Sequence, residues 1–147
     1  MHYYILTSGH RQDGFGRPIS GSPAEWAEEL LAKGVWGGNE STPHLGELRA
    51  GDRVVIHSAR TGFVAAAVVR DQARRTRKSL LRDRNCTHEV PLARVRMFAS
   101  PAALTDRLRK AISRADRDRP MRRTWANYFR QQGIRPISAE VFGIIAG

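Results

Sequence analysis

Short runs of aromatic and β-branched residues recur along the chain, and within residues 88–98 Val95 and Met97 alternate with Arg94 and Arg96; both patterns are typical of strands. Residues 3–7 (YYILT) are aromatic and β-branched and predict a first strand. Residues 51–58 (GDRVVIHS) predict a strand opened by a Gly-Asp turn, and residues 63–71 (FVAAAVVRD) predict its hairpin partner. Residues 88–98 and 134–137 predict two further strands.

Helical spacing marks the remaining periodic segments. In residues 22–34 (SPAEWAEELLAKG), Ser22 fits an N-cap, Pro23 the first helical position and Gly34 the stop, and Trp26 is predicted to face the core. Residues 100–115, 124–133 and 138–147 predict further helices. The hairpin argues against a purely parallel sheet, and the strands outnumber what a helical bundle allows. We therefore predict an α+β fold with a curved, mostly antiparallel sheet or barrel flanked by helices.

Three segments do not fit the periodic pattern. Residues 34–45 (GVWGGNESTPHL) place Trp36 next to a pair of glycines and predict a loop, on which a tryptophan offers a flat platform. The alanines at 65–67 leave their strand without bulk, which predicts that something packs close to the sheet there. Residues 72–85 are strongly basic and predict an irregular excursion.

The charge distribution adds a candidate partner. The chain has 147 residues, as expected for one domain over residues 1–147, and a formal net charge of +11. Residues 1–69 hold six basic and seven acidic residues, whereas residues 70–147 hold 19 basic and seven acidic ones. Folding does not require this asymmetry, but a polyanion would use it, so DNA or RNA is the predicted partner. The alternative is a generally arginine-rich composition with solvated faces.

Other features exclude classes of protein. No apolar run approaches the ~20 residues of a membrane helix, the N-terminus does not resemble a secretory signal, and the single Cys86 cannot form an internal disulfide. These features predict a soluble, cytoplasmic protein. Cys86 and His88 have no second pair at metal-ligand spacing, and no phosphate-binding or nucleophile motif is present. We therefore expect no cofactor, no metal and no catalytic residue.

Several segments together resemble EVE domains of the PUA-like superfamily. "LRAGDRVVIHSARTGFVAAAVVRD" is similar to the central hairpin of EVE domains, and "GIRPISAEVFGIIAG" is similar to their C-terminal segment. "YYILTS" resembles the first strand of EVE and YTH domains, and "GVWGGNE" resembles the "GVW" loop of YTH domains. The resemblance implies a PUA-like barrel flanked by helices that binds nucleic acid, with a modified base as the expected ligand.

The resemblance also implies a base pocket. In YTH domains the tryptophan of the "GVW" loop is one wall of an aromatic cage, and Trp36 matches it. A base stacked on an indole gains ~1–3 kcal/mol, and the neighbouring glycines leave the backbone open to a flipped base. The predicted pocket consists of Thr7, Ser8, Trp36, Gly37, Asn39, His57 and Ser58. The predicted phosphate-binding residues are Arg60, Arg74, Arg75, Arg77 and Lys78.

The sequence departs from the YTH pattern in one respect. Residues 65–123 contain no Trp or Tyr, so a complete cage would need rings from Tyr3, Tyr4, Phe63 or Trp125. Three alternatives to a modified-base reader stay open: an RNA-binding or RNA-modification accessory protein without modified-base selectivity, a small hydrolase acting on nucleotides, and a small partner-binding protein.

Overall fold

The computed structural model describes residues 1–9, 21–76, 86–103, 105–115 and 133–147. In chain order its elements are β1 (Tyr3–Ser8), α1 (Pro23–Ala32), β2 (Val35–Gly38), the 3-10 helix η1 (Leu45–Glu47), β3 (Arg53–Ser58), β4 (Gly62–Val69), β5 (Arg74–Arg75), β6 (His88–Ala102), α2 (Asp106–Ala115), β7 (Ile134–Ile137) and α4 (Ala139–Ala146). None of the helices in these ranges is long and apolar enough to cross a membrane.

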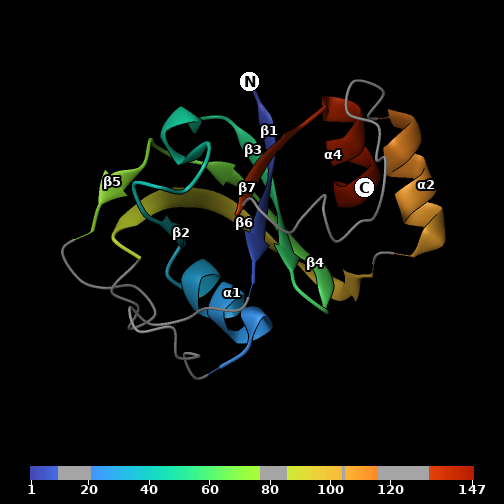
Figure 1. Ribbon diagram of the computed structural model, residues 1–147, viewed down its shortest axis with the longest axis horizontal. Helices are drawn as coiled ribbons and strands as arrows, with labels where there is room; N and C mark the ends of the chain where they lie inside the picture. The colour runs from blue at the N-terminus through green and yellow to red at the C-terminus, as the bar shows by residue number, and fades with distance from the viewer. Residues whose placement is uncertain (10–20, 77–85, 104, 116–132) are drawn as a thin grey trace.

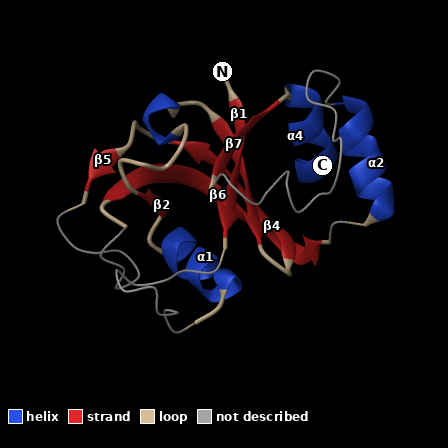
Figure 2. Ribbon diagram, viewed as in Figure 1, coloured by secondary structure: helices blue, strands red, loops and turns tan. Residues whose placement is uncertain are grey.

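The strands form one curved sheet in the order β2-β6-β4-β3-β1-β7, with β5 also paired to β6 (Figure 1). Only the pairing of β1 with β3 is parallel among the strands described. Helix α1 lies on one side of the sheet, and α2 and α4 lie together on the other (Figure 2). This arrangement confirms the predicted α+β fold with a curved, mostly antiparallel sheet flanked by helices.

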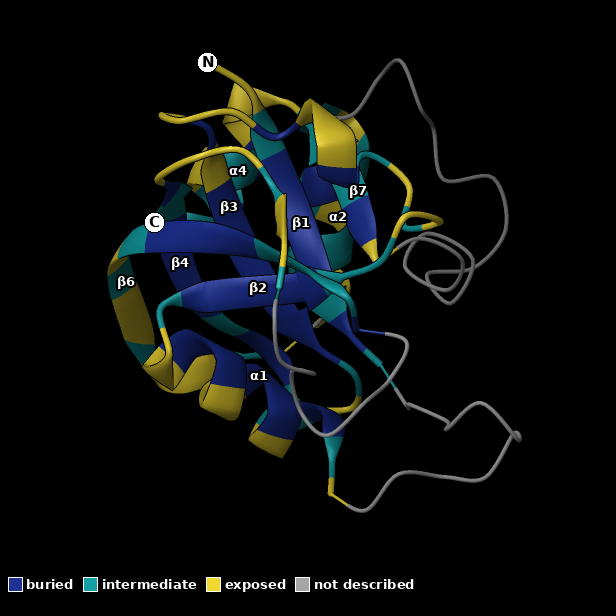
Figure 3. Cartoon of the chain, turned by 90° about the vertical axis from the view of Figure 1, so that its left-hand side faces the viewer, coloured by how far each residue is buried: buried dark blue, intermediate teal, exposed yellow. Residues whose placement is uncertain are grey.

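The alternation along the strands divides the core between the two sides of the sheet. The cluster on the side of α1, the α1-side cluster, takes from the central strands Tyr4, Leu6, Val54, Ile56, Ala65 and Ala67. The cluster beneath α2 and α4, the α4-side cluster, contains Ile5, Val55, Phe63, Ala66, Ile112, Val141 and Ile145. Successive strand residues point to opposite faces, so a single strand supplies both clusters. Figure 3 shows the central strands buried between these layers.

Two helices begin where their caps predict. The Ser22 hydroxyl accepts a hydrogen bond from the Glu25 amide at 3.2 Å, and Pro23 occupies the first turn of α1. Gly34 follows α1 with a φ of 69°, the left-handed conformation that ends many helices. The Ser138 hydroxyl accepts from the Val141 amide at 3.1 Å and caps α4. Each cap satisfies a backbone amide that lacks an intrahelical partner.

The structure corrects three predicted elements. Residues 35–38 form strand β2, not a loop, and pair with β6. β6 extends through Ala102, so α2 begins at Asp106 instead of after Ser100, and Thr105 caps it by accepting from the Leu108 amide at 3.2 Å. The basic excursion contains the short strand β5. The predicted helix over residues 124–133 lies almost entirely outside the described residues.

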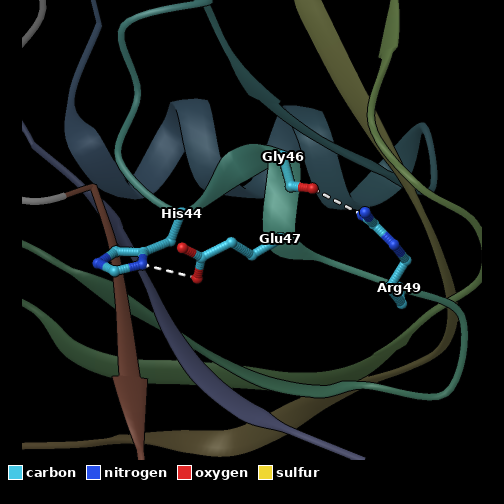
Figure 4. A network of polar contacts seen from close by, with 4 residues as sticks. All are labelled: His44, Gly46, Glu47 and Arg49. Carbon is cyan, nitrogen blue, oxygen red and sulfur yellow. Dashed lines mark hydrogen bonds and ion pairs between the residues drawn. The ribbon is translucent and has the colours of Figure 1, made fainter.

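A network of polar contacts holds the segment between β2 and β3. His44 Nδ1 lies 2.8 Å from Glu47 Oε2, and Arg49 Nη1 donates to the Gly46 carbonyl at 2.6 Å (Figure 4). The buried Asp52 carboxylate accepts from the amides of His2 and Arg49, both at 2.9 Å. Burial raises the pKa of Tyr4, with a further contribution from the Asp52 carboxylate. These contacts fix the start of β1 against the start of β3.

Candidate nucleic-acid interface

Four of the predicted pocket residues meet at the carboxyl ends of β1 and β3. The two strands are parallel and in register, so Thr7 lies beside His57 and Ser8 beside Ser58. The Ala59 amide donates to the Ser8 carbonyl at 2.9 Å and extends this pairing beyond β3. The structure thus brings together strand ends that are about 50 positions apart in the sequence.

These four residues nevertheless face opposite sides of the sheet. The His57 ring lies edge-on to the Phe63 ring, with centroids 5.0 Å apart, and Phe63 belongs to the α4-side cluster. Thr7 is the register partner of His57 and two positions after Ile5, which is in the same cluster. Ser8 faces α1, because its hydroxyl donates to the Pro23 carbonyl at 2.7 Å. Ser58 is the register partner of Ser8, so the pocket residues divide into two pairs.

His57 sits in an apolar environment that changes its titration. Its side chain and backbone are only 6% exposed. Burial removes water from the imidazolium and lowers the pKa of His57 to about 4. The ring is therefore neutral at physiological pH and presents one donor and one acceptor nitrogen, as a contact to a base edge or a main-chain group requires.

Ser8 and Ser58 differ in hydrogen bonding, which gives a matched pair of predictions. Within the described part of the chain, the fully buried Ser58 hydroxyl has no hydrogen-bond partner. A buried polar group without a partner is costly, so we expect Ser58→Ala to raise the free energy of unfolding by about 1 kcal/mol. Ser8→Ala removes a buried hydrogen bond and should lower it by about 1 kcal/mol. Urea denaturation of both variants measures the signs, and equal losses would contradict the assignment.

The position of Trp36 contradicts the prediction of an exposed stacking wall. The residue lies in strand β2, opposite Val90 of β6, and is only 2% exposed. Its ring belongs to the α1-side cluster, together with Trp26 and Leu30 of α1. A base could stack on this indole only by displacing packed neighbours. The prediction of a loop was wrong because residues 35–38 form a strand through pairing with β6, which local periodicity does not reveal. Trp26 is buried, as predicted.

The other residues of the predicted pocket have structural roles. The Asn39 side-chain oxygen accepts from the Ser41 amide at 2.8 Å, and the Asn39 amide donates to the Thr42 hydroxyl at 3.0 Å, so Asn39 organises a turn. Gly37 is buried in β2, opposite Glu89. Tyr4 and Phe63, two proposed cage rings, lie in different clusters.

Cys86 is buried in the α1-side cluster, which shields its thiol from solvent.

Of the predicted phosphate-binding residues, Arg60, Arg74 and Arg75 are described, and these three are exposed but do not form one patch. Arg60 is at the tip of the β3–β4 hairpin, beside the end of β6, where Phe63 pairs with Ala102. Arg74 and Arg75 pair with Glu89 and His88 at the opposite end of this strand. Arg74 Nε contacts Glu89 Oε1 at 2.9 Å, which compensates part of its charge. Arg77 and Lys78 lie outside the described residues.

The structure gathers a different set of arginines, which was not among the predicted site residues. Arg53, Arg94 and Arg96 line one hollow on the face of the sheet that carries α4. The sequence contained two signals for it: Arg94 and Arg96 alternate with apolar residues on a predicted strand, and the alanines at 65–67 lack bulk. The pairing of β6 with β4 places these arginines beside the alanines, and the sequence alone does not reveal that pairing.

Comparison with protein-family models and with curated proteins found no match to the sequence. Solved structures are similar over nearly the whole chain. Human THYN1, in complex with DNA containing 5-methylcytosine, matches with a TM-score of 0.62 and 14% identity, over 99% of this chain and 95% of that one. Rpa0253 from Rhodopseudomonas palustris matches with a TM-score of 0.60 and 17% identity, over 99% and 90%.

The YTH domain of Mmi1 matches with a TM-score of 0.56 and 11% identity, over 99% of this chain and 93% of that one. The identities are low, so what these matches establish is the fold. They agree with the likeness to EVE and YTH domains that the sequence motifs indicated. The chain therefore has the fold that human THYN1 shares with the YTH domain of Mmi1, as the resemblance of the sequence motifs implied.

Proposed function

We propose that this protein is a non-catalytic module that binds nucleic acid. The observation that carries the proposal is the match, over 99% of the chain, to a protein solved in complex with DNA. The formal net charge of +11 supports it, because phosphate contacts supply most of the affinity of such modules. Nine of the 19 basic residues in the second half lie in residues 77–85 and 116–132, outside the described residues.

We further propose that the protein selects a modified base, flipped out of its strand. The support is that THYN1 was solved with DNA containing 5-methylcytosine. Within the described residues, the carboxyl ends of β1 and β3 hold the side chains suited to a base edge. Neutral His57 carries a donor and an acceptor nitrogen on the α4 side of the sheet, and the Ser58 hydroxyl on the α1 side has no partner among the described residues, so one base would contact one of the two and not both. A buried polar group gains most when a ligand supplies its hydrogen bond.

Selectivity is tested by comparing oligonucleotides that differ only in one base. Duplex and single-stranded oligonucleotides with cytosine, 5-methylcytosine, adenine or N6-methyladenine are titrated at fixed salt by fluorescence anisotropy. The proposal expects one modified base to bind at least about tenfold more tightly than its parent, a difference of about 1.4 kcal/mol. Equal affinities would reject selectivity and favour the alternative, a general nucleic-acid binder.

The electrostatic part of the proposal predicts a specific response to salt. For Arg74→Gln/Arg75→Gln we expect weaker binding to all oligonucleotides alike. The slope of log affinity against log salt should become shallower by up to about 2, because each lost phosphate contact on duplex DNA removes about 0.9. Binding titrations between 50 and 200 mM salt, about the range in which such losses are largest, measure the slope.

The matched control for this prediction removes a positive charge from the less basic half of the chain. Lys33 is exposed at the end of α1 and pairs with Glu29 at 3.2 Å. Lys33→Gln should leave the salt slope unchanged. A slope change of the same size per charge in both variants would mean that net charge alone, and not a located contact, drives binding.

A further inference from the structure

A hollow on the α4 side of the sheet combines a small floor with basic walls. Its volume is about 250 Å³, and Ala66 and Val68 of β4 contribute to its floor. Arg53 of β3 is the register partner of Val68, and Arg96 of β6 is the register partner of Ala66. Phe142 and Ala146 of α4 complete the lining. We call this site the alanine-floored hollow.

The small side chains of β4 explain why the hollow exists. The alternation along β4 directs Ala66 toward the α4-side cluster, whereas Ala65 and Ala67 belong to the α1-side cluster. A larger residue at position 66 would fill the space between β4 and the end of α4. Since one water molecule occupies about 30 Å³ of liquid, the hollow has room for a phosphate group with several waters.

Three guanidinium groups surround this space without a carboxylate partner. Arg53, Arg94 and Arg96 are exposed, and none of them forms an ion pair with the described residues. Arg96 Nη2 donates to the Ala146 carbonyl at 2.8 Å, and its guanidinium lies 5.1 Å from the Phe98 ring centroid. A helix C-terminus carries roughly half a negative charge, so α4 offsets only a fraction of the positive charge of three arginines.

The backbone at Arg94 supports a functional reason for this cluster. Ala66 pairs with Arg96 while Val68 pairs with Ala93, so β6 carries one extra residue opposite β4. Arg94 lies in this bulge with a φ of 51°, in the left-handed region that disfavours residues other than glycine. Bulges re-aim side chains, and strained backbone concentrates at functional sites. Here the bulge carries a third arginine at the hollow.

We propose that the alanine-floored hollow binds a phosphate group, with Arg53 and Arg94 as its ligands and Arg96 as a fixed positive neighbour. Arginine donates two parallel hydrogen bonds to a phosphate, and three cations around an open hollow attract a dianion. The phosphate belongs either to a nucleic-acid backbone or to a small phosphorylated molecule. The site itself does not depend on the proposed function, which bears only on the source of the phosphate.

The first experiment titrates the protein with inorganic phosphate while NMR follows the amides of β3, β4 and β6, at an ionic strength held constant with chloride. We expect saturable shifts around Ala66 and Arg94. Arg53→Gln/Arg94→Gln should weaken phosphate binding by about tenfold or more, as the loss of charge-assisted hydrogen bonds predicts. The absence of saturable shifts beyond those from chloride would overturn the proposal.

The matched control removes two positive charges from another exposed surface. Arg107 and Arg114 are exposed on α2, whose buried Ile112 faces the α4-side cluster. Arg107→Gln/Arg114→Gln should leave phosphate affinity nearly unchanged. An equal loss in both double variants would overturn the proposal, because binding would then follow net charge and not the hollow.

A single variant separates ligand binding from folding. Arg94→Gly removes a guanidinium but suits the left-handed backbone, so the protein should unfold at an equal or higher temperature while phosphate binding weakens. Unchanged phosphate affinity in this variant would count against Arg94 as a ligand.

The source of the phosphate is assigned by a second arm with a DNA oligonucleotide. A parallel loss of oligonucleotide and phosphate affinity in Arg53→Gln/Arg94→Gln would support the site and assign it to the backbone. Loss of phosphate affinity alone would support the site and assign it to a small phosphorylated molecule. If the wild-type protein binds phosphate here but no oligonucleotide, the proposed function fails while this site stands.

Discussion

Replacing Trp36 with alanine is expected to lower the free energy of unfolding by about 3–5 kcal/mol, the usual loss when a buried tryptophan leaves a cavity. The indole is 2% exposed and packs in the α1-side cluster, where β2 and α1 meet. The loss is a large fraction of the stability of a domain of this size. Equilibrium unfolding in urea, followed by far-UV circular dichroism, measures it.

Two companion variants define what the Trp36 result means. Met97 is 51% exposed, so Met97→Ala should change the free energy of unfolding by less than about 0.5 kcal/mol. Trp36→Phe keeps an aromatic ring in the core and should lose less stability than alanine. If Trp36→Ala unfolds like the wild type but binds oligonucleotides more weakly, the indole is a stacking surface and its described burial is wrong.

Acidification from pH 7 to pH 4 is expected to destabilise the protein through His57. The pKa of His57 is about 4 in the folded state, against about 6.5 in the unfolded chain. Because the folded pKa is the lower one, the unfolded chain takes up the proton first. The stabilisation is therefore complete above pH 6.5 and is lost as the pH falls toward 4. A shift of this size corresponds to about 3 kcal/mol.

Carboxylates also titrate between pH 4 and pH 6.5 and change the free energy of unfolding. The effect of His57 is therefore measured as the difference between the pH profiles of the wild type and of His57→Gln. The free energy of unfolding is measured in urea at pH 7, 6, 5 and 4.5 for the wild type and for His57→Gln. The variant should lose less stability between pH 6.5 and 4.5 than the wild type. Identical pH profiles would show that His57 takes up its proton equally in the folded and unfolded states.

Elements with local signals were predictable from the sequence. The boundaries of α1 follow from Ser22, Pro23 and Gly34, because a cap, a fixed φ and a left-handed stop act within one helix turn. The start of α4 follows in the same way from Ser138. The continuous apolar runs in β1 and β3 also identified strands, since each run supplies buried residues to both faces of the sheet.

Elements that depend on distant partners were not predictable. Gly37 and Gly38 have low strand propensity, and residues 35–38 are extended only because β6 supplies their hydrogen-bond partners. Ser100 and Pro101 look like a helix start, yet pairing between Phe63 and Ala102 extends β6 past them. Long-range pairing competes with local propensity and prevails at both places.

The candidate site was predictable in part for the same reason. Thr7 and His57 were both chosen as strand ends, but only the parallel register makes them neighbours. The sheet faces that separate Ser8 from His57 follow from that register as well. Arginines were recognisable as exposed, whereas their grouping around Ala66 required the order of the strands. The sequence thus predicted which residues lie at strand ends or on the surface, but not which of these residues lie next to one another.

The central position of β1 has a consequence for how the protein folds. β1 lies between β3 and β7, so one of its neighbours comes from the opposite end of the described chain. On the ribosome, β1 would pair with β3 and then keep an open edge until residues 134–137 emerged. Contacts between such distant residues slow folding. A nascent chain stalled before β7 should therefore expose an unpaired β1 edge and recruit chaperones or aggregate.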